Sequence, residues 1–405
     1  MPVPKPLDSS TWPVPPSSRP RTAPQCDLRE LTALAARGLV EMFDADRKLF
    51  CHRLLCTERG LVREGTSRRY TIITLLGLKE LESAGMHSPF DAHAIYASLI
   101  RDTSWIRGVG DLGLLIWLTA RFEPDRLERV FRTFDCDTAL DRYPDAQESR
   151  TMELAWFLAG LAHACETSPK FVNALTDLSV ETYHRLEENQ GDHGLFGHLN
   201  ASNSLAGRVR GRIGSFADQV YTIYAMCKFA RKFCVEDPLG PALECATAIC
   251  AAQGDLGQWW WLYDVRSGRV SSHYPVYSVH QHGIAPMALF AVEEVTGQCF
   301  DAFIHKGLRW IYGGNELGVD MRDGSRNLLW RCVLARTKQT KYWEMALNAV
   351  RSPSEGTQLG SLKVLYEQRP YEFGWLLFAF SKRAQADLLS FNRTREYLKS
   401  PQSGT

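Results

Sequence analysis

The densest group of residues suited to chemistry lies between Gly257 and His282. It contains three consecutive tryptophans, several tyrosines and a His-x-His pair. Flat aromatic rings pack against the C–H faces of sugars, against prenyl chains and against cations. A histidine whose charge changes near pH 7 suits proton transfer, so His280 is interpreted as a catalytic acid or base, with Tyr277 as a second candidate. The predicted substrate-binding residues of this segment are Trp259, Trp260, Tyr263, Gln281 and His282.

A metal site is the alternative use of a His-x-His pair. His280 and His282 would diverge at a helix start, and the spacing of the sequence supplies no further ligands for zinc. We therefore predict neither a metal nor a cofactor.

A second polar cluster precedes Asp218. Its glycines do not match a dinucleotide-binding fingerprint, and no predicted strand precedes them. The cluster is either a long surface loop or a rim over the active site, whose arginines would bind a carboxylate or phosphate. Its members are His193, Phe196, His198, Asn200, Asn203, Arg208, Arg210 and Arg212, of which His198, Arg210 and Arg212 are predicted to bind substrate.

These residues must be positioned by helices, because stretches with a 3.6-residue period recur and strand-like alternation is nearly absent. The helical stretches group into six pairs, in which a charged amphipathic helix precedes a more apolar one. A helix with a charged face lies outside, and one that is apolar all round is buried. The pairs are 27–44 with 68–83, 91–102 with 111–121, 125–134 with 150–165, 170–187 with 215–233, 238–252 with 279–296, and 300–312 with 371–384.

Six such pairs predict an all-α protein with an (α/α)6 toroid fold, whose inner helices surround a central funnel. A linear solenoid of helical hairpins is the alternative. The stretch 327–350 is predicted as an additional helical excursion. We predict a disordered leader over 1–25, one toroid domain over 26–390 and a flexible tail over 391–405.

The predicted inner helices begin with unusually polar residues. In a ring these starts converge, and they expose free backbone N–H groups and positive dipole ends. Each residue alone could be a helix cap, but arginine at a helix start opposes the dipole. Asp111, Glu153 and Asp218 are therefore candidate catalytic carboxylates. The predicted substrate-binding residues at these starts are Arg69, Tyr70, Gln219 and Glu372.

The phrase Gly-Asp-x-Gly occurs three times, beginning at Gly110, Gly191 and Gly254. The last two copies lie 63 residues apart, and a degenerate copy begins at Asn315. This period corresponds to one helical hairpin with its loops.

Gln-x3-Gly-x-(Phe/Trp), at Gln190–Phe196 and Gln253–Trp259, resembles the QW repeat of terpenoid cyclases and protein prenyltransferases, which are α/α toroids. The paired helices with aromatic loops are also similar to the six-hairpin toroids of glycosidases, sugar epimerases and polysaccharide lyases. The nearest match to the acid motif of the cyclases is Asp135-Cys-Asp137-Thr, which falls near the end of an outer helix and is interpreted as a pair of capping charges.

Composition narrows the possible partners. Lys+Arg is 47 and Asp+Glu is 46, so no net field favours nucleic acid. No apolar run approaches the ~20 residues of a membrane span. The first residues lack the apolar region of a secretory signal. Eleven cysteines without CxxC pairing are typical of a reduced protein, and we predict a cytoplasmic location.

Three functions remain open. The first is a carbohydrate-active enzyme (hydrolase, epimerase or lyase), in which Asp111, Glu153, Asp218 or Glu372 acts as acid or base, or His280 or Tyr277 abstracts a proton. The second is a toroid that binds or cyclises an isoprenoid, with Asp135 or Asp137 as the proton donor. The third is a non-catalytic helical scaffold. The oligomeric state stays open.

Overall fold

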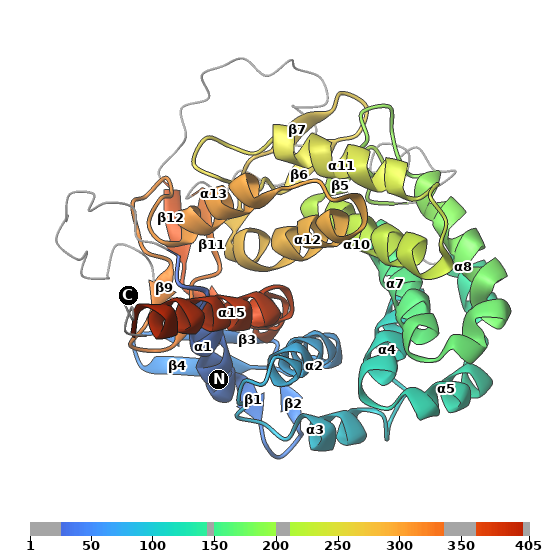
Figure 1. Cartoon of the computed structure of the whole chain (residues 1–405), viewed down its shortest axis with the longest axis horizontal. Coiled ribbons are helices and arrows are strands. Elements are labelled where there is room, and N and C mark those ends of the chain that lie inside the picture. Colours follow the sequence, from blue (N-terminus) through green and yellow to red (C-terminus); the bar gives the residue numbers. More distant parts are fainter. Residues whose placement is uncertain (1–25, 144–149, 200–210, 336–361, 400–405) are drawn as a thin grey trace, which may run out of the picture.

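The structure is a computed structural model that describes residues 26–143, 150–199, 211–335 and 362–399. Within these ranges two layers of helices form a ring (Figure 1). The outer helices are α1 (Leu28–Gly38), α3 (Ala92–Leu99), α5 (Leu127–Thr133), α8 (Val172–Glu187), α11 (Leu239–Ala251) and α13 (Asp301–Ile311). The inner helices are α2 (Arg68–Ser83), α4 (Val109–Phe122), α7 (Thr151–Thr167), α10 (Phe216–Phe233), α12 (Ala285–Thr296) and α15 (Pro370–Lys399). The predicted six pairs are confirmed.

The ring is closed, which confirms the toroid over the solenoid. Each inner helix contacts the next, and α15 returns to pack against α2. Glycines permit this closing contact, because a Cβ on Gly77 would lie 2.1 Å from the backbone oxygen of Gly374. Inner helices are buried on all sides, as in α4, where every residue from Val109 to Ala120 is buried. Outer helices bury one face only.

Short helical segments complete the two layers. They are α6 (Cys136–Asp141), the 3₁₀ turns η1 (Leu39–Met42), η2 (Pro124–Arg126) and η4 (Pro169–Phe171), and the π-helical turn η5 (His280–Ile284). The turn η5 leads directly into α12. Single π turns of this kind are frequent at functional sites.

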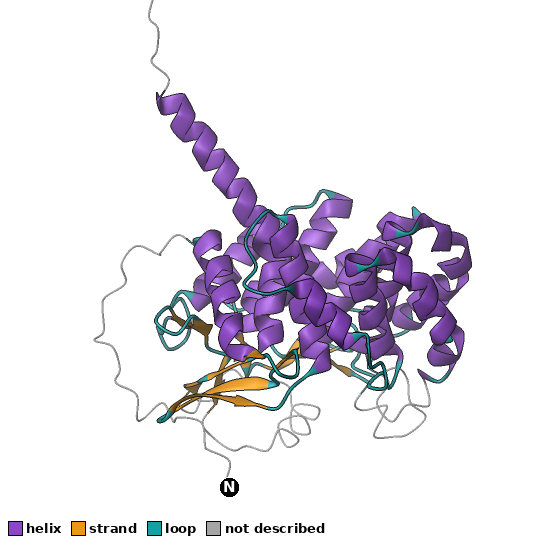
Figure 2. Ribbon diagram, turned by 90° about the horizontal axis from the view of Figure 1, so that it is seen from below, coloured by secondary structure: helices purple, strands orange, loops and turns teal. Residues whose placement is uncertain are grey.

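Short strands, which the sequence pattern did not predict, lie at one side of the ring (Figure 2). Several of them lead into the first residues of inner helices. The strands are β1 (Phe43–Asp44), β2 (Leu49–Phe50), β3 (Arg53–Thr57), β4 (Gly60–Glu64), β5 (Ile213–Ser215), β6 (Leu262–Asp264), β7 (Arg269–Ser272), β8 (Val276–Tyr277), β9 (Arg322–Asp323), β10 (Leu328–Leu329), β11 (Cys332–Ala335), β12 (Leu362–Leu365) and β13 (Glu367–Gln368). They pair antiparallel in the orders β1-β2, β10-β9, β12-β11-β8, β13-β3-β4 and β5-β6-β7.

The predicted helical excursion over 327–350 is wrong in its first part. Residues 328–329 and 332–335 are strands β10 and β11, and β11 pairs with β8 and β12. Its apolar residues are buried by cross-strand pairing rather than on a helix face. Residues 336–350 lie outside the described part of the chain.

At the two ends of the chain, the predicted leader 1–25 lies outside the described residues. Residues 391–399, predicted as part of a tail, continue α15, which extends away from the ring (Figure 2).

All eleven cysteines are free thiols. Within the described ranges, no helix combines the length and the apolar character needed to cross a lipid bilayer.

Candidate active site

The inner helices α4 and α7 approach unusually closely at their first turns. A Cβ on Gly110 would lie 2.6 Å from Cβ of Glu153, and one on Gly113 would lie 2.4 Å from Cα of Phe157. Gly160 faces Gly113 in the same way. Contacts this short exclude any side chain at these positions. The first Gly-Asp-x-Gly copy therefore allows the contact that brings Asp111 next to Glu153.

Arg69, in the first turn of α2, joins these two carboxylates. Its Nε donates to Asp111 Oδ1 at 2.5 Å, and its Nη1 donates to Glu153 Oε1 at 2.8 Å. Burial alone would lower the pKa of Arg69, but the two acidic partners raise it above its usual value. The guanidinium also lies 5.7 Å from the ring centroid of Trp156. Three predicted site residues from three helices thus meet at one point, which we call the Arg69 clamp.

Asp218 lies at the start of the next inner helix, α10, where it is fully buried. Its Oδ1 accepts a hydrogen bond from the backbone N–H of Met152. Its Oδ2 accepts from the backbone and the hydroxyl of Ser215, in a capping box, and His198 Nδ1 lies 2.8 Å from the same oxygen. Asp218 therefore ties the starts of α7 and α10 together and orients His198.

Glu372, at the start of α15, belongs to a buried ionic network. Its Oε1 accepts from Arg331 Nη1 at 2.5 Å, and its Oε2 accepts from Gln368 Nε2 and from the backbone of Arg369. Burial raises the pKa of Glu372 to about 7, although the two arginines act in the opposite direction. Glu367 accepts from Arg369 Nε at 2.6 Å. Nothing in the sequence pattern pointed to Arg331 and Arg369, because they follow the short strands β10 and β13.

An aromatic wall connects the clamp to this network. The rings of Tyr70 and Tyr371 lie 4.5 Å apart, and the exposed His52 stacks on Tyr70 at 5.4 Å. Arg369 Nη1 donates to the hydroxyl of Tyr70 at 3.0 Å. The wall supports the predicted place of Tyr70 at the rim, whereas nothing in the sequence pattern pointed to His52.

Tyr277 and His280 lie beside the same network. Arg331 lies 5.0 Å from the ring centroid of Tyr277, and burial raises the pKa of that phenol to about 12. His280 is buried, its Nδ1 lies 3.3 Å from the backbone oxygen of Trp259, and burial lowers its pKa to about 3. The expectation that His280 changes charge near pH 7 is therefore wrong. Whether either residue acts in catalysis stays a prediction.

Other predicted binding residues fill structural positions. Gln219 is buried and bonds to both the backbone N–H and the carbonyl of Phe196. Trp259 and His282 are fully buried, and the Nε1 of Trp260 donates to the carbonyl of Ala252. The hydrogen bonds of Gln219 and Trp260 stabilise the loops that they contact, and a role in substrate binding stays a prediction for all four residues.

The remaining binding predictions divide as follows. Tyr263, in β6, is fully buried, and Gln281, in η5, is also buried and donates from Nε2 to the backbone oxygen of Tyr277. Arg212 is exposed just before β5. Arg210 lies outside the described residues.

The repeated loops have a common structural explanation. The side-chain amides of Gln190, Gln253 and Asn315 each donate to the carbonyl four residues ahead. Gln190 and Gln253 also donate to a carbonyl of a later outer segment, at Pro241 and Phe303. The repeat fixes each loop and ties it to the next hairpin. The glutamines of the two QW-like segments therefore stabilise their loops through hydrogen bonds.

One cluster among the described residues has donor atoms spaced as for a metal ion: Glu293, Cys299 and Asp301. Two of its members are exposed, and it lies at the end of α12 and the start of α13, away from the clamp. Exposed groups of this kind are common without an ion, so we assign it no role.

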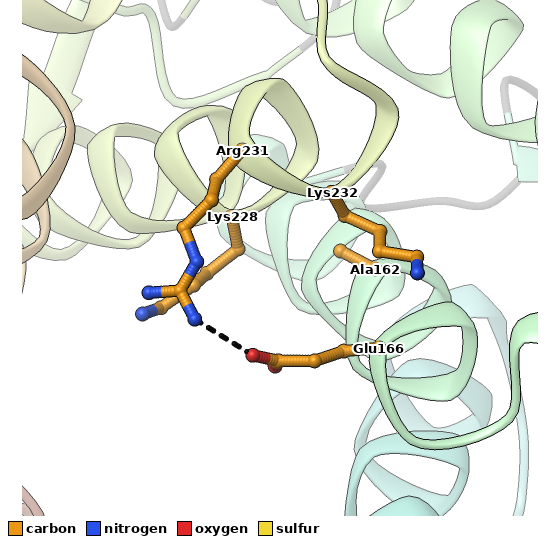
Figure 3. Close-up of a pocket in the computed structure, with 5 residues that line it drawn as sticks. All are labelled: Ala162, Glu166, Lys228, Arg231 and Lys232. Atoms are coloured by element: carbon orange, nitrogen blue, oxygen red, sulfur yellow. Dashed lines mark hydrogen bonds and ion pairs between the residues drawn. The ribbon is translucent and has the colours of Figure 1, made fainter.

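The opposite end of the ring also carries charge. Near the last turns of α7 and α10, a pocket of about 90 Å³ is lined by Ala162, Glu166, Lys228, Arg231 and Lys232 (Figure 3). Arg231 Nη2 donates to Glu166 Oε1 at 2.9 Å, and Lys228 donates to Glu294 at 3.1 Å. None of these residues was predicted as part of a site.

Comparison with known proteins gave structural likeness only. No protein-family model and no curated protein matches the sequence. The chain is similar to a possible GH105-family member from Klebsiella pneumoniae, at 13% identity and a TM-score of 0.54, covering 93% of this chain and 99% of that one. It is similar to an unsaturated glucuronyl hydrolase specific for heparin, at 13% identity and a TM-score of 0.53, covering 90% and 98%.

A third solved structure is a sugar epimerase from a ruminal bacterium, at 11% identity and a TM-score of 0.55, covering 88% of this chain and 98% of that one. At such identities the likeness establishes the fold, a helical toroid of the six-hairpin type. The resemblance to cyclases and prenyltransferases through the QW repeat receives no support from these structures.

Proposed function

We propose that this protein is a carbohydrate-active enzyme, with its active site where the inner helices begin. The observation that carries the proposal is the Arg69 clamp, in which one guanidinium, lying over the ring of Trp156, binds both Asp111 and Glu153. Paired carboxylates perform acid and base steps on glycosidic bonds. Aromatic faces such as that of Tyr70, at the neighbouring wall, pack against sugar rings.

Each residue of the Arg69 clamp has a role in this proposal. Arg69 holds the two carboxylates in one orientation, and Trp156 supports the guanidinium from below. In a hydrolase one carboxyl group protonates the leaving oxygen while the other activates water. In an epimerase or lyase the same carboxylates position a sugar whose proton is removed by a neighbouring base. Both a hydrolase and an epimerase occur among the structures that share this fold.

The isoprenoid alternative is less well supported. It requires Asp135 or Asp137 as the proton donor, yet both are exposed, and Asp135 caps α6 by accepting from the backbone N–H of Thr138 at 3.0 Å. Asp135 is thus the N-cap of α6, and Asp137 lies in the first turn of the same helix. The inner-helix starts also carry the charged Arg69 clamp, whereas carbocations are stabilised by aromatic faces. Incubation with prenyl diphosphates followed by hydrocarbon analysis tests this alternative directly.

A glycan panel in deuterated water tests the proposal. The panel contains unsaturated glucuronyl disaccharides from heparin and neutral reducing disaccharides, and the readouts are released sugar, changed stereochemistry and incorporated deuterium. We expect turnover by the native protein and its loss in an Asp111→Asn, Glu153→Gln double variant. The matched control is Glu166→Gln, at the opposite end of the ring. Absence of turnover and of binding for every sugar would count against an enzyme and favour the scaffold.

A further inference from the structure

Most of the titratable residues predicted as catalytic are occupied or shielded. Asp218 is fully buried and accepts hydrogen bonds at both oxygens. Asp111 and Glu153 share the guanidinium of Arg69. A residue that exchanges protons with a substrate must be within reach of it and must have a free nitrogen or oxygen. His280, which is buried, does not meet the first condition.

His198 meets both conditions. Its side chain is 27% exposed, whereas that of its partner Asp218 is fully buried. The ring nitrogen Nδ1 lies 2.8 Å from Asp218 Oδ2, so the proton of the neutral ring belongs on Nδ1. Among the described residues, none forms a hydrogen bond with Nε2 of this histidine. That nitrogen is therefore oriented as an acceptor.

The backbone places His198 at the clamp. Its carbonyl accepts from the backbone N–H of Thr151 at 3.0 Å, so the histidine lies against the first turn of α7. Glu153 belongs to the same turn, and Asp218 bonds to the backbone N–H of Met152 between them. One helix start thus carries both a member of the Arg69 clamp and the histidine–aspartate pair.

We propose that His198 transfers the proton at this site and that Asp218 is its positioning residue. This inference rests on the proposed carbohydrate chemistry. His198 is the neighbouring base of the epimerase or lyase route: its neutral imidazole takes a proton at Nε2 from a sugar C–H, and the electron pair of that bond stays on the carbon as a carbanion. The resulting imidazolium is stabilised by the buried Asp218 carboxylate, as in other histidine–carboxylate pairs. Nε2 then returns the proton to the departing oxygen or to the sugar carbon.

The chain offers a matched control for this pair. His184, on the outer helix α8, lies 3.4 Å from Glu187 through Nδ1, and its side chain is 56% exposed. The two pairs share their chemistry and differ in their position relative to the ring. His184→Ala should leave turnover within about twofold, as surface substitutions usually do.

The test compares His198→Ala with His184→Ala on the glycan that the panel identifies. We expect kcat to fall by roughly 10²–10⁴-fold in His198→Ala, with little change in KM and partial rescue by added imidazole. Full activity of a folded His198→Ala variant would overturn the role of His198 while the proposed function stands. Failure of the native protein to turn over any sugar would overturn both.

The role of Asp218 needs a readout independent of stability, because Asp218→Asn removes part of a capping box. In protein with ¹⁵N-labelled histidine, NMR should show the His198 ring protonated at Nδ1 and free at Nε2. In a folded Asp218→Asn variant we expect the other tautomer and a lower kcat that imidazole does not rescue. An Nε2-protonated ring in the native protein would overturn the assignment of Asp218.

Discussion

The two ends of the inner-helix ring carry charges in opposite relation to the helix dipoles. At the C-terminal end, Lys228, Arg231 and Lys232 lie near the end of α10, where positive charge is favoured by the dipole (Figure 3). At the N-terminal end, Arg69 lies in the first turn of α2, where positive charge is disfavoured. The first group is explained by helix stability alone. Arg69 is stable at a helix start only because Asp111 and Glu153 neutralise its charge. Because helix stability does not explain its presence there, the N-terminal end is the better candidate for function.

The largest expected effect is a difference in glycan turnover between variants at the two ends of the ring. Asp111→Asn or Glu153→Gln should reduce turnover of a glycan substrate by roughly 10²-fold or more, since each removes a clamp carboxylate that either transfers a proton or positions the sugar. Glu166→Gln, at the other end, should leave turnover nearly unchanged. Steady-state kinetics on all three variants provides the measurement. Equal losses at the two ends would remove the distinction between them.

The second prediction concerns the contact that builds the clamp. Gly110→Ala places a methyl group where Glu153 now lies, so we expect a loss of about 1–3 kcal/mol in the free energy of unfolding, together with reduced turnover. Gly108→Ala is the control, because a Cβ there meets nothing within 4 Å. Thermal unfolding and steady-state kinetics of the two variants provide the measurement. Equal stability and equal turnover of both variants would contradict the close packing of Gly110 against Glu153.

The third prediction concerns the buried network. The pKa of Glu372 is raised from 4.5 to about 7 in the folded protein, so the folded state binds its proton more tightly than the unfolded state. This carboxyl group therefore lowers stability progressively as the pH rises from 4.5 to 7. Glu372→Gln should flatten that part of the stability–pH curve by a few kcal/mol. The measurement is denaturant unfolding of both proteins between pH 4.5 and 7. If burial did not raise the pKa of Glu372, the free energy of unfolding would change with pH equally in the variant and the native protein.

The smallest expected effect lies at the C-terminal end. The nearby ring of His163, whose Nδ1 lies 3.2 Å from Glu166 Oε2, lowers the pKa of Glu166 to about 2, so this group adds stability above pH 4.5 that is lost as the pH falls toward 2. Because its side chain is 40% exposed, the contribution should be below about 1 kcal/mol. Melting curves of Glu166→Gln between pH 2 and 6 should converge with those of the native protein at the acid end. A constant difference would contradict this explanation.

Much of the fold could be predicted from the sequence, because buried and half-buried helices have distinct patterns. The stretch 109–122 is mostly apolar and is buried on every face, whereas Asp301–Ile311 buries one side only. The strands could not be predicted, because most contain two to four residues and several pair with segments far along the chain, as Glu367 does with Leu55. Runs this short carry no clear period.

The candidate site was predictable where helix starts supplied it, as for Arg69, Asp111 and Glu153. It was not predictable where strands or loops did, as for Arg331 and His52. Burial also changed the interpretation of individual residues. His280 and Asp218 have the residue types of proton-transfer groups, yet one is shielded from solvent and the other is fully hydrogen-bonded. Sequence spacing predicts proximity, whereas exposure depends on the whole ring.

The most direct test of the central claim is hydrogen–deuterium exchange with and without a bound glycan. The account predicts slower exchange in the first turns of α2, α4 and α7, around Tyr70, Asp111 and Glu153, and no change near Lys228 in the last turns of α10. Protection confined to the C-terminal end of the ring, with the clamp unaffected by a sugar that binds, would contradict it.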